Sequence, residues 1–298
     1  MTDQATKYSL ERNERFGFLK VSPTPDPEDI TRFYAEEFYS SQYKGFNNSS
    51  LEVQLQDREF HEARWRDIYR AVETVSGRPF RGQKVLDVGC GWAQALHYFK
   101  KQGAECFGFD PAPEAVEYAR KQGLNVRRAG MDSMEAFPGE SFDVVTLMNV
   151  LEHLSDPIAV IESIGRDVLK PGGVLVVEVP NEFNAFQVCG QSVHELEEWW
   201  VAPPAHLNYF NKDSLCNLLS GTGFSVARTE ASFPMEMFLL FGENYVGDKA
   251  LGKSCHEKRV AFEMNLRRQG QEETLHRFYQ ALAQVNIGRQ ITAYAVKS

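Results

Sequence analysis

The stretch from Lys84 to Gln94, KVLDVGCGWAQ, decides the fold of this chain. It predicts a short apolar strand, a Gly-x-Gly turn and an amphipathic helix that continues to about residue 101. Gly89 and Gly91 allow the backbone to bend tightly and to approach a ligand closely. The start of the helix offers unpaired N–H groups and a partial positive charge to an anion. The stretch therefore predicts a cradle for a cofactor that carries a carboxylate or a phosphate.

The residues around the two glycines separate two classes of cofactor. The dinucleotide fingerprint requires a third glycine at position 94, where the chain has Gln94, so NAD and FAD are disfavoured. Asp87 lies two residues before the first glycine, and its negative charge suits a cofactor with an amino group and a sulfonium better than a pyrophosphate. S-adenosylmethionine is such a cofactor.

Four stretches, taken in order, resemble the motifs of class I S-adenosylmethionine-dependent methyltransferases: 85–91 (VLDVGCG), 141–145 (SFDVV), 149–154 (NVLEHL) and 169–175 (LKPGGVL). The resemblance covers about residues 80 to 231. Ala93 stands where many members have a third glycine, and its methyl group leaves the turn usable. The family branch that it resembles is the methyltransferase domain 23 type, which acts on quinone precursors, sugars and other small metabolites.

Strand and helix patterns alternate from residue 84 onward, which predicts a parallel sheet with helices on both faces. With the resemblance, the expected fold is a Rossmann-like α/β sheet of seven mostly parallel strands with an antiparallel last strand. We expect a core at 80–231 plus 289–298. A helical extension or lid at 1–79 precedes it. Residues 232–288 form an inserted helical cap or an oligomerisation element.

The extension contains a predicted helix from about residue 28 and a second one from about 51 to 76. Six aromatic residues between 33 and 46 form either a substrate lid or the hydrophobic face of an ordinary extension. Both interpretations remain open at this stage.

Composition and charge exclude several classes of protein. The chain has 298 residues, 43% of them hydrophobic, and a formal net charge of −9, which argues against a nucleic-acid-binding protein. A polar start and the absence of any run of ~20 apolar residues predict a cytoplasmic protein without a membrane span. Five cysteines without a Cys-x-x-Cys pair indicate neither a zinc site nor a disulfide framework, so no metal is expected.

Asp110 ends the second predicted strand, about twenty residues beyond the glycine turn, where a carboxylate accepts hydrogen bonds from both ribose hydroxyls. The alternative is a cap for the helix that begins after Pro111, and the two roles are compatible. In the resembling family the loop after the third strand lies beside the adenine, which points to Met131 and Asp132. Asn149 ends the fourth strand and faces the ligand crevice. The predicted cofactor-binding set is Asp87, Gly89, Cys90, Gly91, Asp110, Pro111, Met131, Asp132 and Asn149, although for Cys90, as for the other cysteines, the role of a small buried side chain is favoured.

Two histidines are candidates for catalysis. His153 has a pKa range suited to a general base, but its stretch recurs in the family with different substrates, which indicates an architectural part. His206 lies in an atypical loop, 182–210, that resembles a segment over the methyl-transfer site in the same family branch. It either contacts the substrate and removes a proton or only orders the loop. Trp199 and Trp200 either shape an aromatic substrate wall or anchor a lid.

These observations favour a methyltransferase that uses S-adenosylmethionine, releases S-adenosylhomocysteine and acts on a small-molecule or glycan acceptor. O-methylation is the chemistry favoured most, with C- or N-methylation of a small metabolite as the alternative. A second hypothesis is an inactive S-adenosylmethionine-binding regulator or partner subunit, and a third is a nucleotide-dependent oxidoreductase. Motifs of DNA and arginine methyltransferases are absent from the sequence. The oligomeric state stays open, with a homodimer as one option.

Overall fold

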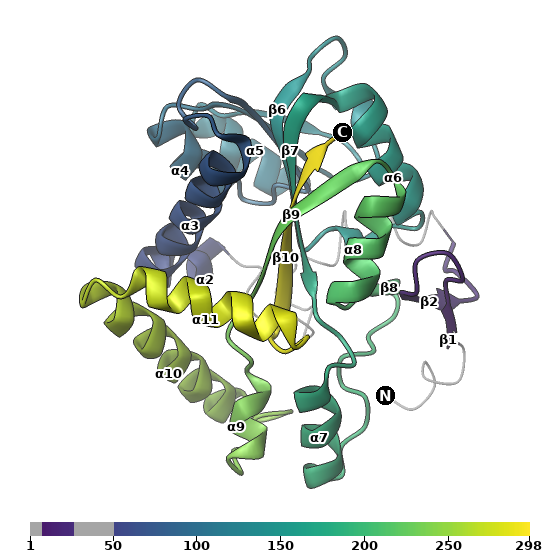
Figure 1. Ribbon diagram of the computed structural model, residues 1–298, viewed down its shortest axis with the longest axis vertical. Helices are drawn as coiled ribbons and strands as arrows, with labels where there is room; N and C mark the ends of the chain where they lie inside the picture. The colour runs from purple at the N-terminus through teal and green to yellow at the C-terminus, as the bar shows by residue number, and fades with distance from the viewer. Residues whose placement is uncertain (1–7, 27–50) are drawn as a thin grey trace.

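The computed structural model describes residues 8–26 and 51–298. Its main element is a seven-stranded sheet (Figure 1). Three strands in the first half of the chain are β3 (Lys84–Val88), β4 (Glu105–Asp110) and β5 (Asn125–Arg128), and four follow: β6 (Phe142–Met148), β7 (Leu169–Pro180), β9 (Phe224–Ala231) and β10 (Gln290–Lys297). The spatial order is β5-β4-β3-β6-β7-β10-β9, and β10 runs antiparallel to both of its neighbours while the pairs from β5 to β7 are parallel. The predicted fold class is confirmed.

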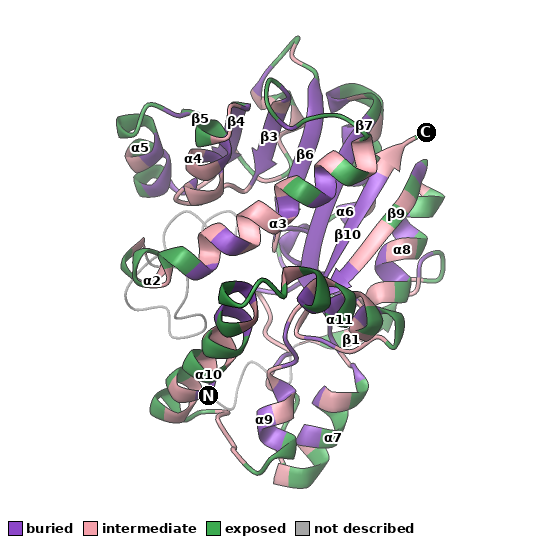
Figure 2. Cartoon of the chain, turned by 60° about the vertical axis from the view of Figure 1, so that its left-hand side comes forward, coloured by how far each residue is buried: buried purple, intermediate pink, exposed green. Residues whose placement is uncertain are grey.

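Helices cover both faces of this sheet, and the strands between them are largely buried (Figure 2). One face packs against α3 (Arg58–Ser76), α4 (Gln94–Lys101) and α5 (Pro113–Lys121). The other packs against α6 (Pro157–Ser163) and α8 (Lys212–Gly221). Alternate residues of β3 serve the two layers, because Val85 belongs to the first core and Leu86 to the second.

Parallel pairing puts the carboxyl ends of β3, β4, β6 and β7 at one edge of the sheet. Three short helical turns contribute further loop structure: η2 (Met134–Ala136), η3 (Leu151–His153) and the π-turn η4 (Ile164–Val168). The first two follow β5 and β6 directly, so they lie at the same edge as the glycine turn. This edge carries the candidate site.

The start of the described chain forms strands rather than helix. β1 (Ser9–Arg12) and β2 (Leu19–Ser22) make a hairpin, and β2 also pairs with β8 (Asn208–Tyr209). The hairpin was not predicted, because neither strand is long enough to show a clear alternation. The predicted helix from residue 28 and the aromatic residues between 33 and 46 lie outside the described residues.

Two other predictions need correction. Residues 182–210, expected as a loop, contain the helix α7 (Ala185–His194) as well as β8. α7 begins where the Asn184 side chain accepts hydrogen bonds from two backbone N–H groups, an N-cap. The helix expected from 51 to 76 is divided at Asp57 into α2 (Leu51–Gln56) and α3.

The insertion is helical as predicted, with α9 (Glu236–Leu240), α10 (Lys249–Arg268) and α11 (Glu272–Gln284). It packs on the helix that precedes the core, since Met264 of α10 joins Phe60 and Ala63 of α3 in one apolar cluster. Arg267 of α10 also forms a two-pronged ion pair with Asp67 of α3. The insertion and α3 are therefore one structural layer.

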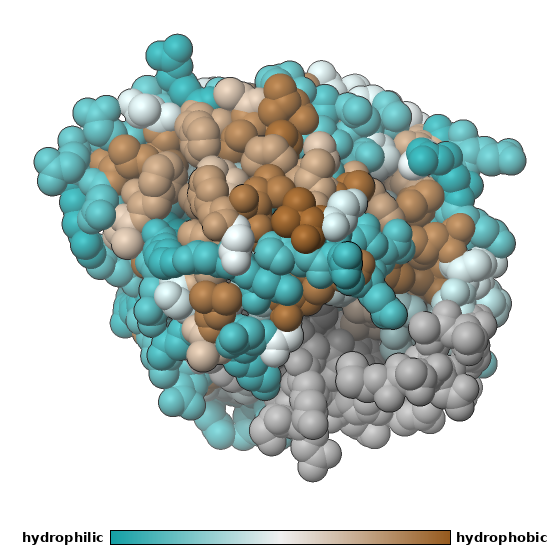
Figure 3. Space-filling model, turned by 90° about the horizontal axis from the view of Figure 1, so that it is seen from below, coloured by the Kyte–Doolittle hydropathy of each residue, from teal (hydrophilic) through white to brown (hydrophobic). Residues whose placement is uncertain are grey.

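The lower end of the molecule in Figure 1 is formed by α7 and α9, which pack together. Seen from below, apolar areas lie between polar ones on this face (Figure 3). Large apolar side chains of these two segments are exposed: Val188, Val193, Leu240 and Phe241. Among the described helices, none has the length and apolar character that crossing a membrane requires.

Candidate cofactor and acceptor site

The glycine turn joins β3 to α4 with left-handed backbone conformations. Gly89 has a φ of 66°, Gly91 of 49° and Ala93 of 55°. A Cβ added to Gly89 would lie 2.7 Å from Cγ2 of Val150, closer than atoms approach in proteins. Glycine is therefore required at position 89 for two reasons, the positive φ and the close approach of the segment that follows β6.

Asp110 connects the glycine turn to the end of β4. Its Oδ2 accepts a hydrogen bond from the N–H of Gly91 at 2.8 Å, and its Oδ1 accepts one from the N–H of Ala112 at 2.9 Å. The side chain is buried. Each carboxylate oxygen has a second lone pair, so these bonds do not prevent Asp110 from accepting a ribose hydroxyl as well.

Asp87 lies within the sheet rather than at the surface of the turn. The hydroxyl of Thr146 donates to its Oδ1 at 2.6 Å. Burial raises the pKa of Asp87 to about 7, the Thr146 hydrogen bond opposes this, and the charge of Asp110 adds to it. A cationic group bound nearby would favour the charged carboxylate, which fits a cofactor with an amino group and a sulfonium.

The loop after β5 approaches the same turn. Sδ of Met131 would lie 3.6 Å from a Cβ on Gly89, so this side chain borders the turn. Asp132 is exposed, and Pro111 is half-buried beside Asp110. Cys90 is half-buried, and its pKa is raised well above the ordinary value by burial and by the charges of Asp87 and Asp110.

Asn149 directly follows β6 and is held by side chains of β7 and β10. Its φ is 56°, and its Nδ2 donates to Oε1 of Glu178 at 3.2 Å. Its Oδ1 accepts a hydrogen bond from Nε2 of Gln290 at 2.6 Å. Arg64 of α3 in turn donates to Oε2 of Glu178 at 2.9 Å. The carboxamide of Asn149 is thus fixed by side chains from β7, β10 and α3.

His153 lies at the end of η3 and is buried. Its Nδ1 lies 2.6 Å from the carbonyl oxygen of Ala205, so this nitrogen is the donor. Burial lowers the pKa of His153 to about 4, although the carbonyls of Ala205 and Asn149 favour the protonated ring. His153 is therefore neutral at physiological pH and ties the chain before His206 to the end of β6.

His206 packs against His153 with ring centroids 5.1 Å apart in an edge-to-face arrangement. Burial lowers the pKa of His206 well below its ordinary value, and His153 and Arg289 add to this. Glu152 is buried beside both rings, and burial raises its pKa well above the ordinary value. One oxygen or nitrogen atom of each of these three residues lies within 4.8 Å of the others, a set of residue types that is able to hold a divalent cation.

The predicted residues thus form two groups, which are joined where Val150 packs against Gly89. Asp110, Gly91 and Met131 surround the glycine turn, and Asn149 leads into the group with His153 and His206. Asp87 is buried within β3, and Asp132 is exposed to solvent. Trp200 is buried between Val21 and Tyr209 and in contact with Trp199, which favours an anchoring role for this pair.

Three supporting residues were missed by the sequence analysis: Arg64, Glu178 and Gln290. Glu178 left a signal, because a charged residue in the apolar run 174–179 needs a buried partner. The cluster of Glu152, His153 and His206 was not recognised from the sequence, because position 206 lies far along the chain from 152 and 153.

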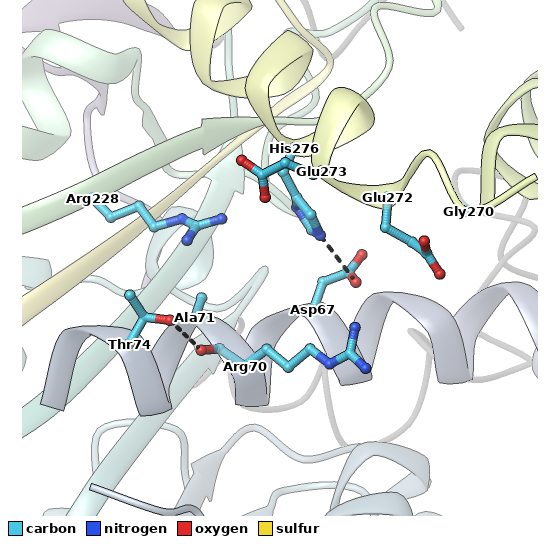
Figure 4. A pocket seen from close by; sticks show the side chains of 9 residues that line it. All are labelled: Asp67, Arg70, Ala71, Thr74, Arg228, Gly270, Glu272, Glu273 and His276. Carbon is cyan, nitrogen blue, oxygen red and sulfur yellow. Dashed lines mark hydrogen bonds and ion pairs between the residues drawn. The ribbon is translucent and has the colours of Figure 1, made fainter. Parts of the chain in front are cut away.

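A cavity of about 340 Å³ lies elsewhere, between α3, β9 and the start of α11 (Figure 4). Its lining includes Asp67, Arg228 and His276, and none of the predicted cofactor or catalytic residues. A smaller cavity of about 140 Å³ touches the outer side of the glycine turn at Trp92 and Ala93. Neither of these two cavities is lined by a predicted cofactor-binding or catalytic residue.

The sheet order, the glycine turn and the acidic residue at the end of β4 define a class: Rossmann-like proteins that bind a methyl donor at the carboxyl edge of the sheet. Residues 57–229, more than half of the chain, match the family model described as a methyltransferase domain. The chain belongs to this family of S-adenosylmethionine-dependent methyltransferases. The resemblance, the enzyme class and the cofactor that the sequence predicted are confirmed at the level of the family.

Solved structures with the same fold include a methyltransferase from Archaeoglobus fulgidus, with a TM-score of 0.52 and 18% identity, covering 83% of this chain and 100% of that one. Another is magnesium protoporphyrin IX methyltransferase from Synechocystis PCC 6803 with bound SAH, with a TM-score of 0.53 and 15% identity, covering 92% and 100%. At these identities the similarity shows the fold alone.

Similar sequences include the ubiquinone biosynthesis O-methyltransferase of Xanthomonas oryzae pv. oryzae (strain PXO99A). It is 40% identical over 117 residues, which are 37% of this chain and 48% of that protein. The protein of the same name from Cereibacter sphaeroides (strain ATCC 17029) is 37% identical over 109 residues, 35% of this chain and 43% of that protein. The chain spans about half the length of the relatives it matches.

Proposed function

We propose that the protein transfers a methyl group to a hydroxyl oxygen of a small-molecule or sugar acceptor. The observation that carries this proposal is the buried pair of His153 and His206. His153 lies three residues after Val150, the residue that packs against Gly89, and His206 packs against His153. The relatives named O-methyltransferases support the choice of oxygen as the acceptor atom.

The glycine turn and Asp110 would hold the cofactor. Val150 packs against Gly89 where a Cβ would stand, so only glycine fits at this bend, and Asp110 fixes the turn through the N–H of Gly91. Asn149, held by Glu178 and Gln290, presents a rigid wall beyond β6. S-adenosylmethionine supplies a methyl group bonded to a positively charged sulfur, which a well-placed nucleophile accepts.

The two histidines would orient the acceptor. His206 is neutral at physiological pH because its site is buried, so its ring is able to accept a hydrogen bond from an acceptor hydroxyl. His153 donates to the carbonyl of Ala205 and so positions the backbone next to His206. We assign His206 to the acceptor and His153 to positioning. The buried surroundings exclude water from both.

Calorimetry with S-adenosylhomocysteine and NAD tests the cofactor site. We expect binding of S-adenosylhomocysteine and none of NAD, and a loss of affinity of more than about tenfold in Asp110→Ala, which removes two charge-assisted hydrogen bonds and the ribose acceptor. Glu117→Gln, on the exposed surface of the following helix, is the matched control. Tight NAD binding without a response to S-adenosylhomocysteine would contradict the proposal.

Turnover with hydroxyl-bearing aromatic and sugar acceptors, followed by mass spectrometry, tests the reaction. His206→Ala should lower turnover by about 10²–10⁴ while cofactor affinity is unchanged. A methyl group found on nitrogen or carbon would replace O-methylation by one of the alternatives. Cofactor binding without turnover on any acceptor would support an inactive regulatory protein instead.

A further inference from the structure

Two arginines approach each other where α3 and α10 meet beyond the end of β7. Arg64 belongs to α3 and Arg259 to α10. Arg259 stacks on the ring of Phe60, which lies one helical turn before Arg64 on the same face of α3, so the two guanidinium groups lie on the same side of the helix contact. The positive charge of Arg64 acts on Arg259, and both charges act on His61. The carboxylates of Glu178 and Glu263 act on both arginines and balance part of their repulsion, but Glu263 approaches Nε of Arg259 only to 3.9 Å.

Arg64 is only partly engaged by the protein. Its Nη2 donates to Oε2 of Glu178 at 2.9 Å and lies 3.4 Å from Oε1 of Gln290. A quarter of its side chain, 26%, remains accessible to solvent. The guanidinium has further N–H groups, on Nε and Nη1, for which the described residues provide no hydrogen-bond acceptor.

Arg259 is more deeply buried and less well paired. Its side chain is 14% exposed, its Nε lies 3.9 Å from Oε1 of Glu263, and Nε donates no hydrogen bond within the described residues. Glu263 is shared, because Arg267 lies at the same distance from its other oxygen. The guanidinium of Arg259 stacks on the ring of Phe60, with 4.9 Å to the centroid.

This arrangement is costly for a cation. Burial lowers the pKa of Arg259, Glu263 opposes this, and the charge of Arg64 lowers it further. A buried charge without a hydrogen-bonded counterion destabilises a protein, so a site that keeps one is suited to a ligand of opposite charge. Burial and the charge of Arg64 also lower the pKa of His61 to about 4, as expected beside cations.

We propose that Arg64 and Arg259 form a subsite that binds an anionic group of the acceptor, a carboxylate or a phosphate. Arginine presents paired N–H groups in a plane, which matches the oxygens of both anions. This inference rests on the proposed function, since it names the class of acceptor that the same site takes.

The carboxylate of Glu178 connects the proposed subsite to the reaction site, because it is hydrogen-bonded on both sides. Oε2 of Glu178 binds Arg64 and its Oε1 accepts from Asn149 at the end of β6. Gln290 contacts both Arg64 and Asn149. An anion held by Arg64 therefore places the rest of the acceptor beside Asn149. The acceptor that fits is a hydroxyl compound with its anionic group a few atoms from the hydroxyl.

The first experiment measures anion binding by calorimetry on the full-length protein with S-adenosylhomocysteine, using inorganic phosphate and acetate as probes. We expect binding that Arg259→Met weakens at least tenfold and Arg259→Lys weakens less. Arg268→Met is the matched control, because Arg268 lies on the same helix in an exposed pair with Glu59. The probe that binds more tightly identifies the anion. No binding by the wild type, or equal binding by Arg259→Met, would overturn the subsite.

Chemical denaturation without an anion provides the second measurement. Because Arg259 is buried without a hydrogen bond to Glu263, its removal should leave Arg259→Met as stable as the wild type or more stable, and added phosphate should stabilise only the wild type and the lysine variant. A variant that is less stable and responds to phosphate like the wild type would show a merely structural arginine and overturn the subsite.

Methyl-transfer kinetics with two acceptors that differ in a carboxylate test whether the subsite serves the reaction. For 3,4-dihydroxybenzoate, Arg259→Met should raise KM at least tenfold, while KM for catechol, which lacks the carboxylate, should stay unchanged. An equal change for both acceptors would contradict the assignment. If no acceptor is methylated although anion binding depends on Arg259, the proposed reaction fails and the anion site stands.

Discussion

Asn149 adopts a left-handed backbone conformation that most residues avoid. Non-glycine residues pay about 1 kcal/mol or more for this conformation, and asparagine tolerates it best. Here Glu178 and Gln290 hold its side chain from two neighbouring strands, and its N–H donates to the carbonyl of Glu178. The strain lies at the carboxyl edge of the sheet, beside the candidate site. A fixed side chain there pre-organises the site instead of leaving it to a mobile loop.

Gly89→Ala tests the cradle at the scale of one residue. The new Cβ would lie 2.7 Å from Val150 and require a φ of 66° from alanine. We expect a loss of about 1–3 kcal/mol in the free energy of unfolding and a clear loss of S-adenosylhomocysteine affinity. Denaturation and calorimetry measure the two effects.

Gly252→Ala is the control for this change, because it lies in helix α10 with only ordinary contacts for a Cβ. It should stabilise the protein by up to about 1 kcal/mol. Unchanged cofactor affinity in Gly89→Ala would show that the cofactor does not use this turn.

The insertion and α3 are joined by charge as well as by apolar packing. Asp67 of α3 receives both Nη groups of Arg267 and lies 3.4 Å from Nε2 of His276. The Asp67 and Arg267 side chains are largely buried. The insertion therefore depends on the helix that precedes the core, and α3, α10 and α11 form one layer over the sheet.

Asp67→Asn tests this docking at the scale of the elements. The change removes the carboxylate that Arg267 and His276 share, which leaves Arg267 with Glu263 at 3.9 Å and His276 with Glu230, and breaking a buried ion pair costs about 3–5 kcal/mol. We expect the free energy of unfolding to fall by an amount of this order in chemical denaturation. Glu59→Gln, which breaks the exposed pair with Arg268, should cost less than about 1 kcal/mol. Equal effects of the two changes would contradict the docking role of Asp67.

His276 connects three parts of the molecule at once. It lies on α11, within 3.4 Å of Asp67 on α3 and of Glu230 on the edge strand β9, and Figure 4 shows it pointing toward Asp67. Hydrogen bonds to Asp67 and Glu230 raise its pKa to about 9, although burial opposes this. The charged ring thus holds the helical layer against the sheet.

The stability of the whole protein should depend on pH through His276. Its folded pKa of about 9 exceeds the unfolded value of 6.5, so its contribution is complete below pH 6.5 and is lost as the pH rises to 9. We expect the free energy of unfolding to fall across this window by about 1–3 kcal/mol. His276→Gln should remove that part of the dependence. A variant with the same slope as the wild type would refute the assignment.

The sequence by itself determined the features that depend on neighbours along the chain. The alternation of strands and helices, the glycine turn at Gly89 and the acidic end of β4 at Asp110 are local patterns, because the backbone conformations that they require are set by the residues themselves. The family motifs belong to the same class of signal. They were sufficient for the fold, the enzyme class and the cofactor.

The tertiary structure alone decided which distant residues meet. Arg64, Asn149, Glu178 and Gln290 come from four segments, and their contact depends on strand order and on the docking of α3. Helix α7 and the hairpin at the start of the chain were missed because long-range packing, not local pattern, stabilises them. Paired charges and hydrogen bonds across a sheet carry no sequence periodicity, so only the folded chain shows which of these residues meet.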